Sequence, residues 1–219
     1  MLKLKKINKN DYYALLIIAI LFSLMLYISW LKWLHPIIDC GREVYIPWLI
    51  TKGDILYKDI AFYYGPFAVY FIALLFKLFG ASLTISYITG ILVNIILCGT
   101  IYFLARQLLS PLESALMIAI YFQIGPFAPN LGSYEGFIFP YSFATLFATL
   151  FILLQIALII GYLKHNNPFK LLYLSAIFSA LTITCKQEYA LSSLLISIAI
   201  TIYLVKTNQS TKNIIYYWL

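Results

Sequence analysis

Half of the acidic residues in this chain lie in one stretch, residues 35–79, just after the first long apolar segment. Asp39, Glu43, Asp54 and Asp59 are four of the eight carboxylates. An unpaired charge in the hydrocarbon core of a bilayer costs about 2.5–3.5 kcal/mol or more, so these side chains must lie outside it. Because large apolar side chains alternate with the charges, we expect a structured loop on a membrane surface, with clustered carboxylates available for chemistry.

The composition of the chain indicates an integral membrane protein. Of its 219 residues, 63% are hydrophobic and 11% are charged, and the mean hydropathy is +0.91. Aromatic residues make up 18%, and Tyr and Trp favour the boundary between water and lipid. The net charge of +7 does not indicate a nucleic-acid partner, because the basic residues are scattered at segment ends and form no patch. We interpret them as signals of membrane topology.

Three cysteines, Cys40, Cys98 and Cys185, show no CxxC spacing and have no histidine at ligand spacing. A metal site built on cysteine is therefore not expected. Free thiols are the main interpretation, and a Cys40–Cys185 disulfide on the outer face stays open as the alternative.

The apolar segments predict an all-α fold with about six membrane-spanning helices in a single transmembrane domain. The first segment follows a lysine-rich start and is too long for a secretory signal, so we expect a retained helix with its N-terminus in the cytoplasm. The spans are expected at residues 12–34, 83–104, 112–124, 140–162, 169–184 and 189–204. Residues 35–82 would form an outer loop with interfacial helices. Residues 205–219 would form an inner segment and the start of a seventh span, before which the chain is truncated.

The number of spans depends on residues 66–79. As a helix this segment is roughly 20 Å long, against about 30 Å of hydrocarbon, so we expect it to lie flat on the outer face. The positive-inside rule then places five further basic residues in the cytoplasm: Arg106, Lys164, Lys170, Lys206 and Lys212. In this arrangement six of the eight carboxylates lie outside, and Asp11 and Glu113 lie inside. An acidic site is therefore expected at the outer face.

Several short motifs follow the first acid of this loop. They are Gly41-Arg42-Glu43 with Pro47, the run from Lys52 to Asp59 (KGDILYKD), Tyr64-Gly65-Pro66, the run from Leu74 to Gly80 (LLFKLFG), and Lys186-Gln187-Glu188. Their order resembles the C-type (GT-C) membrane glycosyltransferases, and is most similar to the bacterial lipopolysaccharide-core and protein-mannosyltransferase-like branch. Many relatives carry adjacent Asp and Glu at the first position, whereas here Asp39 is followed by Cys40.

The resemblance implies transfer of a sugar from a polyprenyl-phosphate carrier to a lipid, glycan or protein acceptor at the outer face of a prokaryotic cell membrane. It implies that Asp39 is the general base that removes the proton of an acceptor hydroxyl, with Glu43 as a second catalytic acid. Five residues are expected to bind the substrates: Arg42, Lys58, Glu135, Lys186 and Glu188. Among them, the cations Arg42, Lys58 and Lys186 would receive the phosphate leaving group. The motifs require no cofactor, and a divalent cation bound by the carboxylates of the outer loop is left open as an alternative to a site without metal.

Each candidate residue also has a structural interpretation. Asp39 can be a solvated acid where a helix starts, and Glu43, one helical turn later, can pair with Arg42 or Lys52. Glu135 can be an ordinary loop charge. Lys186 and Glu188 can be an interfacial pair whose lysine extends toward water.

Two other classes of function remain open, a polytopic transporter or flippase subunit and a non-catalytic membrane assembly protein. Transporters place ionisable groups or broken helices near the middle of the membrane. The segments 83–105 and 141–163 contain no charge. This distribution favours chemistry at the membrane surface over transport.

Overall fold

The computed structural model of the chain describes residues 8–30, 39–128, 136, 138–164, 168–207, 214 and 217–218. In this described part all the regular structure is helical, which confirms the all-α prediction. The helices are α1 Lys9–Ser29, α2 Asp39–Lys52, α3 Phe67–Phe79, α4 Leu83–Arg106, α5 Pro111–Ile124, α6 Phe143–Lys164, α7 Phe169–Ile183 and α8 Gln187–Lys206.

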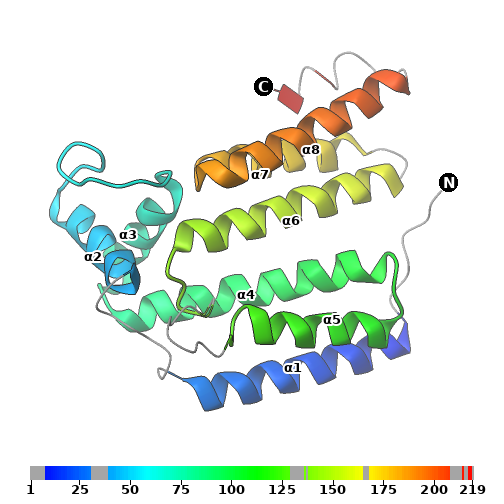
Figure 1. The fold of residues 1–219 in the computed structure, drawn as a ribbon, viewed down its shortest axis with the longest axis horizontal. Helices are drawn as coiled ribbons and strands as arrows, with labels where there is room; N and C mark the ends of the chain where they lie inside the picture. Colours follow the sequence, from blue (N-terminus) through cyan, green and yellow to red (C-terminus); the bar gives the residue numbers. More distant parts are fainter. Residues whose placement is uncertain are drawn as a thin grey trace.

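Six of the helices form a bundle, and α2 and α3 form a helical hairpin at one end of it (Figure 1). Helices α1, α4, α5, α6, α7 and α8 run side by side through five pairs of neighbours. The pairs α4–α5, α6–α7 and α7–α8 are antiparallel, and the pairs α1–α5 and α4–α6 are parallel. The end of the bundle that carries α2 and α3 is called the hairpin end here, and the opposite end is called the far end. The starts of α4, α6 and α8 lie at the hairpin end.

Side-chain caps explain several helix starts. Asn8 and Asp11 form a reciprocal capping box at α1, with hydrogen bonds of 3.1 and 2.8 Å, so this helix starts before the expected residue 12. Ser82 caps α4, and Ser110 with Glu113 forms a second capping box at α5. The predicted starts of the helices from α4 onward agree with the structure to within a few residues.

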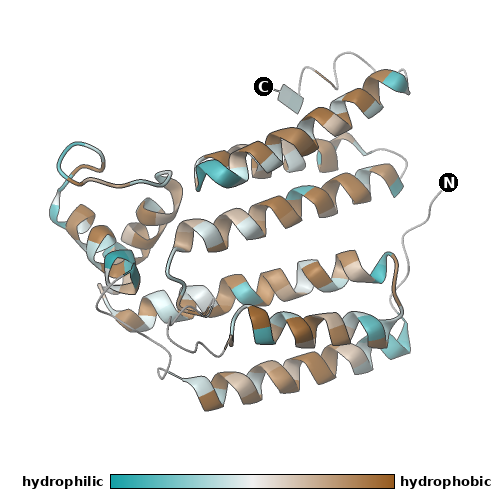
Figure 2. Ribbon diagram, viewed as in Figure 1, coloured by the Kyte–Doolittle hydropathy of each residue, from teal (hydrophilic) through white to brown (hydrophobic). Residues whose placement is uncertain are grey.

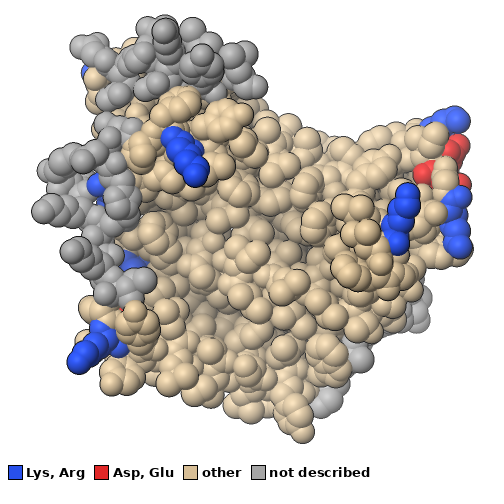
Figure 3. All heavy atoms as spheres, turned by 180° about the vertical axis from the view of Figure 1, so that it is seen from behind, with Lys and Arg blue, Asp and Glu red and all other residues tan. Residues whose placement is uncertain are grey.

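Within the described residues, four helices are long and apolar enough to cross a membrane: α1, α4, α6 and α8, with 21, 24, 22 and 20 residues. Hydrophobic residues cover most of their length, and hydrophilic residues gather at helix ends and on α2 (Figure 2). On the face shown in Figure 3, the charged side chains lie toward the two ends, and a broad uncharged band separates them. The chain is therefore an integral membrane protein of the all-α class.

The hairpin is attached to the bundle by aromatic packing. Phe67 of α3 contacts Phe147 and Phe151 of α6, with ring centroids 5.4 and 5.1 Å apart, and Phe71 contacts Phe147 at 5.2 Å. These rings belong to a buried core that also contains residues of α4. Aromatic pairs of this kind contribute about 0.5–1.5 kcal/mol each beyond their burial, so α3 is fixed against the hairpin-end half of α6.

At the far end, a buried ion pair joins the start of α1 to the end of α4. Arg106 donates to Asp11 through Nε and Nη2, and the Tyr102 hydroxyl donates to the same carboxylate at 2.7 Å. Asp11 and Arg106 were both expected on the cytoplasmic side. Their contact is consistent with that shared location.

Candidate functional site

The first turn of α2 brings three charged side chains together. Arg42 Nη1 lies 3.0 Å from Asp39 Oδ1, and Arg42 Nη2 lies 3.3 Å from Glu43 Oε1. The spacing of three and four residues on a helix places Asp39 on the same side as the other two. The two carboxylates differ in access, because the Asp39 side chain is 42% exposed and the Glu43 side chain only 3%.

Glu43 reaches from α2 to the beginning of α6. The backbone N–H of Phe143, the first residue of α6, donates to Glu43 Oε2 at 2.7 Å. A carboxylate is favourable there because the first N–H groups of a helix lack intrahelical partners and carry partial positive charge. Desolvation by burial nevertheless raises the pKa of Glu43 to about 7, although the hydrogen bonds from Phe143 and Arg42 oppose the shift.

The loop before α3 is anchored to the turn between α7 and α8. The Gly65 N–H donates to the Cys185 carbonyl at 2.9 Å, and the Phe67 N–H donates to the Thr184 carbonyl at 3.1 Å. The Gln187 amide adds a bond of 2.9 Å to the carbonyl of Tyr63. A Cβ at position 65 would lie 2.1 Å from the Thr184 oxygen, so glycine is required at this close approach. The Tyr64-Gly65-Pro66 and Lys186-Gln187-Glu188 motifs are therefore in direct contact.

Lys186 is held between the motifs by aromatic and hydroxyl groups. Its ammonium donates to the Tyr141 hydroxyl at 3.2 Å and to Thr145 Oγ1 at 3.1 Å, and it lies 4.9 Å from the centre of the Tyr64 ring. Burial lowers the pKa of Lys186, but the hydrogen bond to Tyr141 and the nearby Glu188 outweigh this, and the net pKa lies above its usual value. Lys186 is therefore a cation at neutral pH.

Tyr64 and Tyr141 connect Lys186 to Arg42. The Arg42 guanidinium lies 5.5 Å from the centre of the Tyr64 ring, and its Nη2 donates to the Tyr141 carbonyl at 3.2 Å. The two cations are thus joined through the same two tyrosines. We call the complete set the hairpin-end cluster: Asp39, Arg42, Glu43, Tyr64, Tyr141, Thr145, Lys186 and Glu188.

Five of the seven residues proposed for the site from the sequence belong to this cluster. Glu188 is at its edge, 70% exposed and 3.9 Å from the Lys186 ammonium. Lys58 lies in the loop between α2 and α3, is exposed, and its ammonium has no hydrogen-bond or ion-pair partner within the described part of the chain. Glu135 lies outside the described residues. The catalytic and substrate-binding roles of these residues stay predictions.

Asp59, another acid of the hairpin, has a structural role. Asp59 Oδ2 accepts a hydrogen bond of 2.9 Å from the Ile55 N–H and closes the loop after α2. Of the two partners considered for Glu43, Arg42 is the one in contact. Lys52 instead lies over the ring of Trp48, 5.6 Å from its centre.

Three members of the cluster, Tyr64, Tyr141 and Thr145, were not predicted from the sequence as functional residues. Tyr64 was part of a quoted motif, but nothing indicated that its ring lies beside two cations. Tyr141 and Thr145 carry no local signal at all, because their significance depends on contacts with Arg42 and Lys186. Such contacts join segments far apart in the chain.

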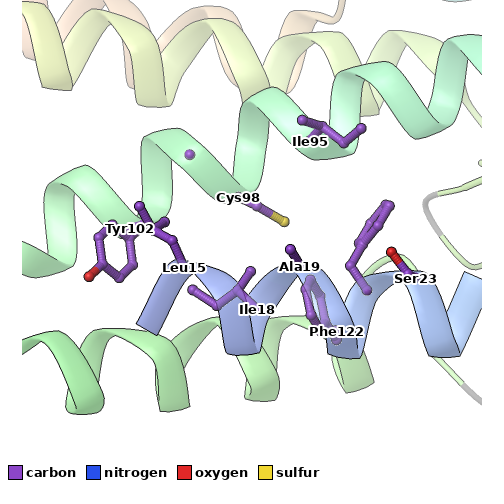
Figure 4. Close-up of a pocket in the computed structure, with 10 residues that line it drawn as sticks. Leu15, Ile18, Ala19, Ser23, Ile95, Cys98, Tyr102 and Phe122 are labelled. Carbon is purple, nitrogen blue, oxygen red and sulfur yellow. The ribbon is translucent and has the colours of Figure 1, made fainter. Parts of the chain in front are cut away.

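A separate pocket lies between α1 and α4, with Phe122 of α5 at one side (Figure 4). Its volume is about 350 Å³ and its lining is almost entirely apolar. Ser23, Cys98 and Tyr102 supply the polar atoms, and none of the ten lining residues is acidic or basic. This pocket therefore holds no side chain that is charged at neutral pH, and it shares no residue with the hairpin-end cluster.

A second polar group of side chains lies inside the bundle, between α6, α7 and α8. Gln155 bonds to Ser193 and Ser197, with distances of 2.8 Å and 3.0 Å, and Ser179 bonds to the same two serines. Tyr217 also donates to Ser197 at 3.0 Å. These groups are uncharged and satisfy one another, which is the pattern of hydrogen bonds that hold membrane helices together.

Metal-binding groups do not converge in the described residues. No set of three His, Cys, Asp or Glu side chains there lies close enough to hold an ion. At the hairpin-end cluster, Asp39 and Glu43 already share Arg42, which does not suit a cation site. All three cysteines are buried, and no disulfide joins Cys40 to Cys185.

Comparisons of the chain with protein-family models, with curated protein sequences and with solved structures found no match.

Proposed function

We propose that this chain is a glycosyltransferase that moves a sugar from a polyprenyl-phosphate carrier to an acceptor at the outer face of the membrane. The observation that carries the proposal is the hairpin-end cluster, in which an accessible carboxylate pairs with one cation, Arg42, and two tyrosines connect this cation to a second, Lys186. Its acid can take a proton from a hydroxyl, and its cations can receive a phosphate. The order of motifs that resembles the GT-C glycosyltransferases supports the same assignment.

In this proposal Asp39 is the general base. It is the more accessible of the two acids on the first turn of α2, and Arg42 orients its carboxylate at 3.0 Å. As the bond between sugar and phosphate opens, the acceptor oxygen forms the new bond to the sugar and its proton passes to Asp39. The deep burial of Glu43 favours a supporting role for that residue.

Arg42 and Lys186 are proposed to receive the phosphate leaving group. Charge-assisted hydrogen bonds to phosphate are about twice as strong as neutral ones, and a guanidinium offers several donors in a fixed plane. Lys186 is prearranged by Tyr141 and Thr145, so little side-chain freedom is lost when an anion binds. Glu188 forms the exposed edge of the cluster, where the acceptor can approach.

We further propose that all six helices of the bundle span the membrane, with the hairpin end outside and the N-terminus in the cytoplasm. Helices α5 and α7 have 14 and 15 residues, or roughly 20 Å each, so the bilayer must thin or the flanking loops must enter it. Lys9, Arg106, Lys164, Lys170 and Lys206 belong to helix ends at the far end, which agrees with the positive-inside rule.

This topology predicts which positions a membrane-impermeant maleimide can label in intact cells. Lys58→Cys and Glu135→Cys should react, whereas Lys206→Cys and Asn208→Cys should stay protected until the membrane is opened. Each substitution is made in a background without the three natural cysteines. The reverse pattern would place the hairpin-end cluster in the cytoplasm and contradict an outer active site.

The proposed role of Lys186 is tested by Lys186→Met, which keeps most of the length of the side chain and removes its charge. Loss of a charged hydrogen-bonding group costs about 1.5–3 kcal/mol, so kcat/KM for a polyprenyl-phosphoryl sugar should fall by roughly 10- to 150-fold. Transfer of radiolabelled sugar by the reconstituted protein measures this. The matched control is Lys77→Met on α3, an exposed lysine outside the cluster, which should leave kcat/KM within about threefold of wild type. Equal rates for both variants would remove Lys186 from the site.

A further inference from the structure

Glu43 is the buried acid of the hairpin-end cluster, and no hydroxyl acceptor can reach it without rearrangement. Its side chain is 3% exposed, and the Phe143 N–H occupies Oε2. Among the described residues, Arg42 is the charged group in contact with it, and Arg42 in turn contacts Asp39, Tyr64 and Tyr141. Lys186 follows beyond these two tyrosines. Arg42 contacts Glu43 through Nε at 3.4 Å and Nη2 at 3.3 Å.

The balance of charge in the cluster depends on Glu43. Its two cations, Arg42 and Lys186, face three acids, Asp39, Glu43 and Glu188. With Glu43 ionised, the acids outnumber the cations and an incoming phosphate is repelled. With Glu43 protonated, two cations face two acids, and one of those acids is Glu188 at the exposed edge.

We propose that Glu43 binds a proton when the phosphate of the lipid carrier enters the cluster, and that this proton releases Arg42 to the phosphate. Glu43 is then a positioning residue, since it acts on the substrate through Arg42. The proton comes from the surrounding water and converts the carboxylate to a carboxylic acid. This inference rests on the proposed function, because it assumes that the cluster receives a lipid phosphate.

The geometry allows the proton to act on Arg42 without dismantling the start of α6. A neutral carboxylic acid keeps a carbonyl oxygen that accepts the Phe143 N–H, whereas its attraction for the Arg42 guanidinium is lost with its charge. Arg42 retains Asp39 at 3.0 Å and the Tyr141 carbonyl at 3.2 Å, which hold the guanidinium near the cluster. The burial that places the pKa of Glu43 at about 7 makes the exchange accessible near neutral pH.

Because binding of the proton to Glu43 and binding of the anion to the cluster are linked, the affinity for the anion should depend on pH. If the anion binds the protonated form, its dissociation constant should be about tenfold larger at pH 8 than at pH 6, given a pKa of about 7 for Glu43. The probe is farnesyl methyl phosphate, a phosphodiester with one constant negative charge over this range and no sugar to transfer. Binding to the full chain in nanodiscs is measured by calorimetry.

The Glu43→Gln variant should bind the probe equally well at pH 6 and pH 8, with an affinity close to that of wild type at pH 6. Gln is neutral and keeps an acceptor for the Phe143 N–H. The matched control is Glu188→Gln, which removes an exposed acid of the same cluster and should keep the tenfold dependence on pH. Calorimetry of the wild type at pH 8 in two buffers of different ionisation enthalpy should also show nearly one proton taken up per anion.

The outcomes separate this inference from the proposed function. Binding that is independent of pH, or an equal dependence on pH in wild type and Glu43→Gln, would overturn the role of Glu43 and leave the phosphate site intact. If Glu43→Gln does not fold, a proton uptake near zero in the wild type would overturn that role equally. No binding of the probe at any pH would overturn both the inference and the proposed receipt of phosphate by the cluster.

Discussion

Asp39→Asn should lower sugar transfer by a factor on the order of 10²–10⁴ while the protein still inserts and folds. Asn retains an oxygen that can accept from Arg42 Nη1, so the salt bridge of 3.0 Å is replaced by a hydrogen bond in the same place. It cannot take the proton of an acceptor hydroxyl, and this is the step that the variant removes. The measurement is single-turnover transfer from a radiolabelled polyprenyl-phosphoryl sugar.

Asp54→Asn and Asp59→Asn are the matched controls for this prediction. Both acids belong to the loop after α2, and Asn at position 59 can still accept from the Ile55 N–H. Their transfer rates should stay within a few-fold of wild type. If Asp39→Asn transferred sugar at a near-normal rate while Glu43→Gln or Glu135→Gln did not, the base would have to be reassigned. If none of these acids mattered, the enzyme proposal would fall.

Gly65→Ala should both destabilise the protein and abolish most transfer. The new Cβ would lie 2.1 Å from the Thr184 oxygen and 2.5 Å from its carbonyl carbon, and both atoms are backbone. The loop must move, which would break the Gly65–Cys185 and Phe67–Thr184 hydrogen bonds and shift Tyr64 away from Lys186. Overpacking of this kind costs about 1–3 kcal/mol or more, and we expect a Tm lower by several degrees and transfer below about a tenth of wild type.

Gly99→Ala is the matched control, because it makes the same change on α4 with no atom within 4 Å of the new Cβ. It should be neutral or slightly stabilising, since Ala favours a helix over Gly by about 1 kcal/mol. Thermal unfolding in detergent, followed by tryptophan fluorescence, compares the two variants. A Gly65→Ala protein with wild-type Tm and transfer would show that the contact between the two motifs does not hold the site.

The sequence was sufficient to predict the helices and the end at which the acids gather. A long apolar run in a membrane must satisfy its own backbone hydrogen bonds, and a helix is the simplest structure that does so. Capping residues such as Ser82 and Ser110 mark helix starts locally. The same reasoning placed Asp39, Arg42 and Glu43 on one turn, because helical spacing decides which side chains meet.

The composition of the site could not be predicted in the same way. Glu43 and Phe143 are 100 positions apart in the chain, and Tyr63 and Gln187 are 124 apart. No periodicity or propensity relates such residues, since their contact depends on how α2, α6 and α8 pack. Glu43 was predicted to be catalytic because nothing in the sequence indicates that its side chain is buried against α6. That burial is seen only in the structure.

The fate of the bond between sugar and carrier phosphate tests the central claim most directly. Membrane vesicles that contain the chain are supplied with a polyprenyl-phosphoryl hexose labelled separately in the sugar and in the lipid. The account predicts that the sugar label moves to an acceptor, that free polyprenyl phosphate accumulates, and that Asp39→Asn stops both. If the sugar instead stays on its carrier while the intact lipid crosses to the other leaflet, the chain is a flippase and the glycosyltransferase proposal is wrong.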